Sequence, residues 1–217
     1  MPDQTADLPR GSMDFGPLVV TFDDRVLRPR LWTLLQASWA AELAPALPPG
    51  PVLELCSGAG HIGQAAAVLT GRPLVQVDLD AHACDLARAN AASNRIATPV
   101  QVRCGDLGDA LTPDERFALV LADPPYLPQD EVDEWPDDPD HAIDGGPEGL
   151  DLLRRCLAVA GAHLLPGGVV LLQARGREQV EGLRDDLAAA GLELTDVRVQ
   201  DDRRAVALLR RAGTVAT

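Results

Sequence analysis

The chain has 217 residues, of which 46% are hydrophobic and 24% charged, which predicts one compact domain and excludes two ordinary enzyme domains. No apolar run approaches the ~18 residues that cross a bilayer, and residues 1–11 lack the basic and apolar regions of a secretory signal, so we expect no membrane association and a cytoplasmic location. The formal net charge of −14 comes from 33 acidic residues against 19 bases, all arginine; such a surface repels phosphates and disfavours nucleic acid as a partner.

The N-terminal part is predicted to be a flexible tail, residues 1–17, followed by a single domain, residues 18–217. The apolar, β-branched run Leu18–Phe22 predicts a short strand. Between residues 31 and 46, apolar side chains recur at spacings of three and four, which predicts a helix that ends at Pro48-Pro49-Gly50.

From residue 52 onwards, short apolar runs alternate with helical patterns. Such alternation predicts parallel strands joined by crossover helices. The predicted strands are 52–55, 74–78, 100–104, 118–122 and 169–173, and the predicted helices are 62–69, 81–92, 150–164 and 178–190.

The last two apolar runs, 192–199 and 205–209, have no helix between them. A parallel return needs a dozen or more residues, so these runs should pair as an antiparallel hairpin at the sheet edge. The sequence therefore predicts a Rossmann-like α/β fold: a seven-stranded, mostly parallel sheet with a C-terminal antiparallel hairpin and helices on both faces.

A glycine-rich loop, Glu54-Leu-Cys-Ser57-Gly58-Ala-Gly60-His-Ile-Gly63, follows the first strand of this alternation. Its Gly-x-Gly-x-x-Gly spacing, with Asp78 twenty positions after Gly58, fits a nicotinamide dinucleotide site. The loop also resembles motif I of class I methyltransferases, which bind S-adenosyl-L-methionine. Glu54 favours the second cofactor, because a carboxylate at this strand end suits a cationic methionyl amine better than a pyrophosphate.

The resemblance to class I methyltransferases implies further cofactor-binding residues. Gly58 and Gly60 would let the backbone approach the cofactor, with Ser57 beside them. Asp78, followed by Leu79, would accept hydrogen bonds from both ribose hydroxyls. Asp106 would accept the adenine amine, with Leu107 packed near the ring, although a helix N-cap is an alternative role for Asp106.

The tetrapeptide Asp123-Pro124-Pro125-Tyr126 directly follows an apolar strand. Its two prolines fix the backbone and remove two N–H donors, leaving carbonyls that can accept hydrogen bonds from an amine. The Asp123 carboxylate and the Pro124 carbonyl can hold the two N–H groups of a planar nitrogen and stabilise the charge that develops there. Tyr126 can stack on the planar group, and Pro125 completes the predicted acceptor site.

The order of these motifs resembles that of the HemK/PrmC glutamine methyltransferases of peptide-chain release factors, over roughly residues 18 to 185. Leu27-Arg-Pro29-Arg30-Leu-Trp-Thr33 resembles that family's Pro-Arg-x-x-Thr segment, which makes Arg30 a candidate acceptor-binding residue. The 142–150 stretch resembles its Ala-Leu-x-Gly-Gly-x-x-Gly-Leu motif. Three features depart from the family: Asp123 replaces its asparagine, Leu34 replaces an acid, and the helical substrate-docking domain is missing.

The resemblance implies an N-methyltransferase whose acceptor is a protein glutamine or other amide, or a small-molecule amine. An aspartate at position 123 is also typical of enzymes that methylate RNA or DNA bases, which leaves that acceptor open. An NAD-dependent dehydrogenase is a weaker alternative, because a chain without lysine has no Tyr-x-x-x-Lys pair. A cofactor-binding subunit without activity is disfavoured by the intact tetrapeptide.

The acidic segment, residues 130–140, contains seven acids with no base between them. It is predicted to be either a solvated loop or a lid that attracts cationic groups and repels phosphate. Arg28 and Arg30 are the only bases that we expect near the acceptor site. Four scattered cysteines and four scattered histidines have no ligand spacing, so no metal site is predicted.

Overall fold

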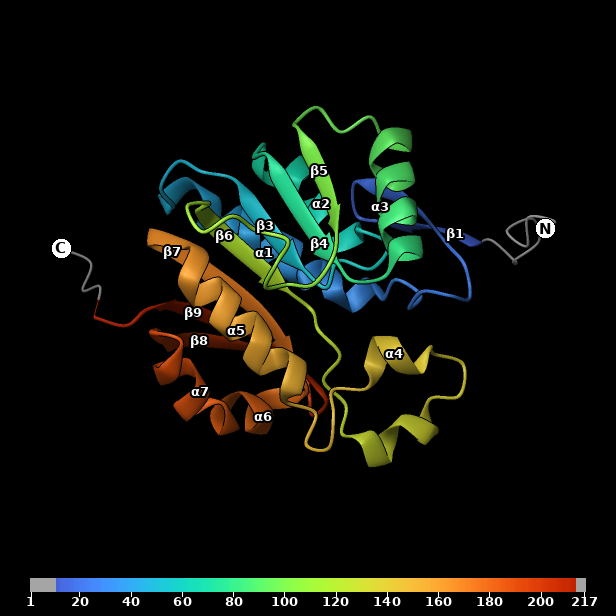
Figure 1. Cartoon of the computed structure of the whole chain (residues 1–217). Coiled ribbons are helices and arrows are strands. Elements are labelled where there is room, and N and C mark those ends of the chain that lie inside the picture. The colour runs from blue at the N-terminus through green and yellow to red at the C-terminus, as the bar shows by residue number, and fades with distance from the viewer. Residues whose placement is uncertain (1–10, 214–217) are drawn as a thin grey trace.

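The computed structural model describes residues 11–213. Its central feature is a seven-stranded sheet in the order β5-β4-β3-β6-β7-β9-β8 (Figure 1). The first five strands in this order are parallel, and β9 runs antiparallel to both neighbours. The strands are β3 (Val52–Leu55), β4 (Leu74–Asp78), β5 (Val100–Cys104), β6 (Phe117–Ala122), β7 (Leu164–Ala174), β8 (Leu192–Asp201) and β9 (Arg204–Arg211). The predicted Rossmann-like sheet and its C-terminal hairpin are confirmed.

Helices cover both faces of the sheet, because alternate side chains of each strand point to opposite sides. On one face, Val52 and Leu119 pack with residues of the helices that come earlier in the chain. On the other face, Leu53 and Val120 pack with residues of the later helices. The helices of the first face are α1 (Leu34–Leu43), α2 (His61–Thr70) and α3 (Ala81–Ser93), and those of the second are α5 (Asp151–His163), α6 (Gly176–Gly182) and α7 (Arg184–Ala189).

Two predicted helices are interrupted. The predicted helix 31–46 consists of α1 between two 3-10 turns, η1 (Leu31–Thr33) and η2 (Ala44–Ala46). Pro45 lies within η2 and has no N–H for the α-helical ladder, which accounts for the change of helix type at this end. The predicted helix 178–190 is divided into α6 and α7 at Leu183, where ψ is 7°.

The predicted N-terminal tail extends too far along the chain. Residues 1–10 lie outside the described part, but Gly11–Phe15 forms strand β1, which pairs antiparallel with β2 (Leu18–Phe22). Asn90 of α3 fastens this hairpin to the main domain by accepting a hydrogen bond from the Thr21 backbone N–H at 2.9 Å. Ordered structure therefore begins by residue 11 and not after residue 17.

The predicted long loop between β6 and α5 contains a 3-10 helix, η3 (Gln129–Glu134), and a short helix, α4 (Asp140–Ile143). This segment projects from the sheet beside the carboxyl end of β6 (Figure 1). Among the described helices, none combines the length and apolar character required to cross a membrane.

Candidate functional site

Two cavities lie at the carboxyl ends of the central parallel strands, where open α/β sheets bind ligands. We call them the cofactor cavity, of about 430 Å³, and the acceptor cavity, of about 160 Å³. The residues that line both are Leu27, His61, Asp123, Pro125 and Ala142. The two cavities therefore meet at Asp123.

The cofactor cavity contains most of the residues predicted for it. Those that line it are Ser57, Gly58, Asp78, Leu79, Asp106 and Leu107. A Cβ atom added to Gly58 would meet no atom within 4 Å, so its backbone faces open space. This arrangement offers polar groups from three neighbouring strand ends to an elongated ligand.

Asp78 lies at the end of β4, and its carboxylate organises the glycine-rich loop. Its Oδ2 accepts the Gly58 N–H at 2.7 Å, and its Oδ1 accepts the Asp80 N–H at 2.9 Å. Burial raises the pKa of this carboxyl above its usual value. Because a carboxylate has about four acceptor positions, Asp78 can still accept hydrogen bonds from a diol in the cavity.

Glu54 was predicted to bind the cofactor, but it does not line the cavity. It is 2% exposed, its Oε1 accepts the Gly63 N–H at 2.8 Å, and its Oε2 accepts the Gln76 Nε2–H. Glu54 shares a sheet face with Val52, so its side chain points toward α2 and away from the loop opening. Burial raises its pKa to about 8. Glu54 thus positions the start of α2.

Gly60 is also absent from the cavity wall, contrary to its predicted role. Its φ is +84°, and an added Cβ would collide with the side chains of Gln64 and Ala87. An added Cβ on Gly63 would collide with the Glu54 carboxylate. These two glycines are required for close packing of α2 against the sheet, whereas Gly58 alone faces the cavity.

Asp106 lines the cofactor cavity in an ion pair. Both of its carboxylate oxygens lie 2.6 Å from Arg155 Nη2, and Oδ1 also accepts the Gly108 N–H at 2.9 Å. The Arg155 guanidinium lowers the pKa of Asp106. The N-cap alternative does not apply, because Asp106 precedes a turn and not a helix. A ligand amine that binds Asp106 must share its carboxylate with Arg155.

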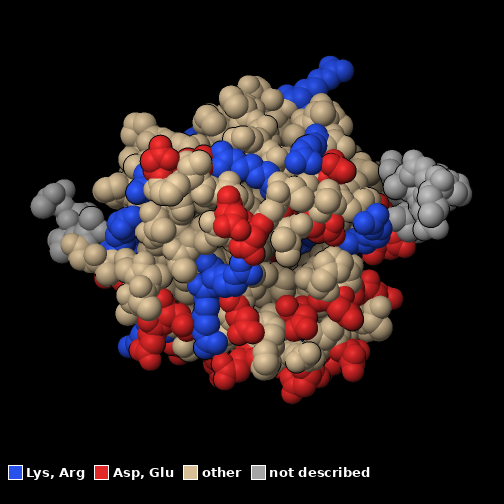
Figure 2. Space-filling model, viewed as in Figure 1, with Lys and Arg blue, Asp and Glu red and all other residues tan. Residues whose placement is uncertain are grey.

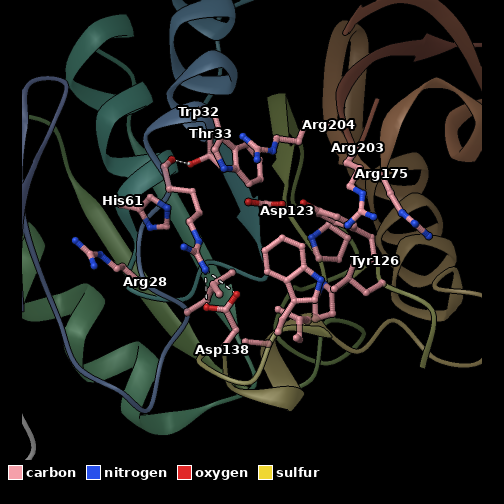
Figure 3. Close-up of a pocket in the computed structure, with 18 residues that line it drawn as sticks. Arg28, Trp32, Thr33, His61, Asp123, Tyr126, Asp138, Arg175, Arg203 and Arg204 are labelled. Carbon is pink, nitrogen blue, oxygen red and sulfur yellow. Dashed lines mark hydrogen bonds and ion pairs between the residues drawn. The ribbon is translucent and has the colours of Figure 1, made fainter. Parts of the chain in front are cut away.

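The acceptor cavity combines a carboxylate with aromatic walls (Figure 3). Asp123, Pro124, Pro125 and Tyr126 line it, as does Arg30, so all the predicted acceptor residues are brought together. Trp32 and Trp135 also line it. The chain has only three tryptophans and one tyrosine, and three of these four side chains surround Asp123.

Burial raises the pKa of Asp123 to about 7, and no hydrogen bond or charge from the described residues opposes this effect. His61, at the junction of the cavities, is packed edge-on against Phe15 with ring centroids 4.8 Å apart. Burial lowers the pKa of His61 to about 4, so its imidazole is neutral at physiological pH. The junction therefore contains a neutral imidazole and a carboxyl group that titrates near neutrality.

The tetrapeptide is held by contacts that the sequence did not reveal. Gln179 of α6 donates from Nε2 to the Tyr126 carbonyl at 2.9 Å and accepts the Arg175 N–H at 2.7 Å. Gly149 packs so closely that an added Cβ would collide with the Tyr126 carbonyl. The glycines of the 142–150 stretch thus allow the chain to pass beside the tetrapeptide.

The predicted charge distribution around the acceptor cavity is wrong in two respects. Arg175, Arg203 and Arg204 line the cavity in addition to Arg28 and Arg30. Three acids of the acidic segment are paired with these arginines. The pairs are Arg30–Asp138 at 2.5 Å, Arg175–Glu131 at 2.6 Å and Arg203–Glu134 at 3.7 Å.

The ion pairs hold the acidic segment across the acceptor cavity from three different parts of the chain. Acidic side chains gather over η3 and α4, next to a central group of arginines (Figure 2). The sequence could not reveal these pairs, because the partners are 44 or more positions apart and no local pattern links them.

Comparison with known proteins identifies the family. The family described as "Methyltransferase small domain" matches residues 39–135. The release factor glutamine methyltransferase of Mycobacterium tuberculosis is 32% identical over 206 residues, which cover 88% of this chain and 64% of that protein. The ribosomal protein uL3 glutamine methyltransferase of Bradyrhizobium diazoefficiens is 34% identical over 67% of this chain and 47% of that protein.

Solved structures share the fold. The ribosomal protein L11 methylase of Lactobacillus delbrueckii subsp. bulgaricus superposes with a TM-score of 0.63 at 18% identity, covering 87% of this chain and 83% of that one. The hMettl16 catalytic domain, in complex with MAT2A 3′UTR hairpin 1, superposes with a TM-score of 0.74 at 17% identity, covering 94% and 77%.

The chain spans less than two thirds of the length of these two glutamine methyltransferases. Within that span, the sequence similarity extends over the glycine-rich loop, the Asp123 tetrapeptide and the strands that carry them. The chain therefore belongs to the class I S-adenosylmethionine-dependent methyltransferases and is HemK/PrmC-like.

Proposed function

We propose that this chain is an N-methyltransferase that uses S-adenosyl-L-methionine to methylate a side-chain carboxamide nitrogen of a protein. The observation that carries the proposal is the meeting of the cofactor and acceptor cavities at Asp123. The similar proteins named above are glutamine methyltransferases of a release factor and of a ribosomal protein, which supports an amide acceptor.

The residues of the cofactor cavity fit S-adenosylmethionine, which supplies an electrophilic methyl group. Asp78 would accept hydrogen bonds from two ribose hydroxyls, using the acceptor positions left free by Gly58 and Asp80. Asp106 would bind the adenine amine beside Leu107. Glu54 acts indirectly, by holding α2 and the glycine-rich loop in position.

Asp123 and the Pro124 carbonyl would accept the two N–H groups of the carboxamide. These bonds orient the nitrogen toward the cofactor cavity and stabilise positive charge as it develops there. Tyr126 would pack on the plane of the amide. Since the pKa of Asp123 is about 7, a large fraction of the carboxyl is ionised at physiological pH. The carboxylate can accept a hydrogen bond from one amide N–H and can take the proton that the nitrogen loses when it is methylated.

The two other enzyme alternatives have less support. The comparisons that name an activity name methyltransferases, and they give no support to a nicotinamide-dependent enzyme. Base methylation would need arginines free to bind phosphates, yet Arg30, Arg175 and Arg203 at the acceptor cavity are paired with acids. A small-molecule amide remains a second acceptor, and the experiment below compares it with protein.

The proposal is tested by incubating the purified chain with methyl-labelled S-adenosylmethionine and, separately, a release factor, ribosomal protein uL3, free glutamine or ribosomal RNA. Label on a protein glutamine, located by mass spectrometry, is expected. Asp123→Ala is the control and should lower turnover about 100-fold or more while cofactor affinity changes little. Label only on free glutamine or RNA, or none with any acceptor, would contradict the proposal.

A further inference from the structure

A third cavity, which we call the outer cleft, adjoins the acceptor cavity. Its volume is about 540 Å³, and it lies between residues 22–30 and residues 134–138. Four residues line both the outer cleft and the acceptor cavity: Arg28, Arg30, Trp135 and Asp138. The outer cleft therefore borders the acceptor cavity along these four residues and touches the cofactor cavity only at Val26.

The four shared residues form the boundary between the outer cleft and the acceptor cavity. Arg30 Nη2 contacts both carboxylate oxygens of Asp138, at 2.5 and 2.6 Å, and Figure 3 shows this pair as dashed lines at Asp138. The backbone of Trp135 is held beside it, because the Trp135 backbone N–H donates to the Val132 carbonyl at 2.9 Å and the Trp135 carbonyl accepts the Asp138 backbone N–H at 3.0 Å. An indole and an ion pair thus form part of this boundary.

We propose that the outer cleft binds an extended polypeptide segment and that Trp135 is a specificity-determining residue, past which the acceptor side chain reaches Asp123. This inference rests on the proposed methylation of a protein carboxamide. A passage bounded by a flat indole and a closed ion pair admits an unbranched side chain that ends in a planar group. It separates the polypeptide backbone, in the cleft, from the reacting nitrogen.

The charge of the outer cleft favours polypeptide over nucleic acid. Five carboxylates line it, against Arg28 and Arg30. Asp138 is paired with Arg30, Glu134 with Arg203 at 3.7 Å, and Asp23 contacts His82 Nε2 at 2.8 Å. Asp24 and Asp137 are left to face an incoming chain. These acids repel phosphates and attract lysine or arginine residues that flank the acceptor.

The location of the bound segment is tested by photo-crosslinking. The probe is a synthetic peptide with a central glutamine, a lysine on each side and a benzophenone side chain two positions away. Crosslinks to residues 22–24 or 134–138 of the full chain are expected, whether or not the peptide is methylated. Crosslinks elsewhere, no crosslinks, or displacement of the peptide by ribosomal RNA at physiological salt would overturn the proposal.

The role of Trp135 is tested by steady-state kinetics with a lysine-flanked glutamine peptide lacking benzophenone. Trp135→Ala should raise the peptide KM about tenfold with a smaller change in kcat, and Trp135→Phe should restore most of the loss because it keeps a flat face. The matched control is Trp39→Phe, in a core residue that lines none of the three cavities. The cofactor dissociation constant, measured by calorimetry, should stay within twofold in all variants.

An unchanged peptide KM in Trp135→Ala, or an equal rise in Trp39→Phe, would refute the role of Trp135. Failure of the proposed function has a different signature. In that case the wild-type chain binds the cofactor but transfers no methyl group to any carboxamide, and the crosslinking result still decides where the polypeptide binds.

Discussion

Asp123 should destabilise the folded chain at and above neutral pH, and its replacement by asparagine should remove this cost. Burial raises its pKa from 3.8 to about 7. Ionising this carboxyl therefore costs about 4 kcal/mol more free energy in the folded chain than in the unfolded chain. Asparagine has nearly the same shape and cannot ionise. The family resemblance also makes it the usual residue at this position.

The effect has a defined dependence on pH. Below about pH 4 the carboxyl is protonated in both the folded and the unfolded chain, so it adds no pH-dependent term. Between pH 4 and 7 it is ionised only when unfolded, and this difference favours unfolding increasingly as the pH rises. Above pH 7 the folded chain carries the full cost of a buried charge, up to about 4 kcal/mol.

Urea denaturation of wild type and Asp123→Asn at pH 4.5 and pH 8 measures this cost. About 1 kcal/mol of the cost is already present at pH 4.5, so the gain in unfolding free energy on substitution should be larger at pH 8 by at most about 3 kcal/mol. Because both cavities open onto Asp123, solvent relieves part of the burial, and we expect a difference of about 1 to 3 kcal/mol. Asp24→Asn, at an exposed position, is the control and should give equal small changes at both pH values. A gain that is independent of pH would refute the reasoning.

Three further predictions concern the loop, the cofactor and the charge. Gly63→Ala should lower the unfolding free energy by about 1–3 kcal/mol in urea denaturation, because the added Cβ would collide with the Glu54 carboxylate. Gly58→Ala is the comparison: its added Cβ meets open space, and only its φ of +51° adds backbone strain. Asp78→Ala should weaken cofactor binding at least about tenfold by calorimetry, and an unchanged affinity would remove Asp78 from the ribose site. Anisotropy titration at physiological salt should detect no binding of ribosomal or transfer RNA; salt-dependent, micromolar binding would instead favour a base acceptor.

Most of the fold could be predicted because buried parallel strands have a strong local signature. All six residues of β6 are buried, for example, and the sequence shows an uninterrupted apolar run there. The chain-order rules for crossovers and hairpins then determined the sheet. The segment between β6 and α5 was beyond such reasoning, because η3 forms ion pairs with distant arginines and α4 has only four residues, so neither shows an apolar repeat.

The candidate site was predicted where a strand end alone determines position. Asp78 is the last residue of β4, Asp123 directly follows β6, and both line a cavity as expected. Glu54 was misplaced because its position one residue before the end of β3 turns its side chain to the α2 face, where Gln76 is its neighbour in the β3–β4 register. Trp135 and Arg203 were missed because only the folded chain brings them to the same cavity.

The position of β9 also affects how the chain folds during its synthesis. β9 is the last strand in residues 11–213, yet it lies between β7 and β8 and pairs with both. During translation, β7 and β8 leave the ribosome before their common partner, so each keeps an unpaired backbone edge until residues 204–211 emerge. Until then the nascent chain is an open sheet that ends at β7, and this is the stage at which chaperones that protect unpaired strands matter most.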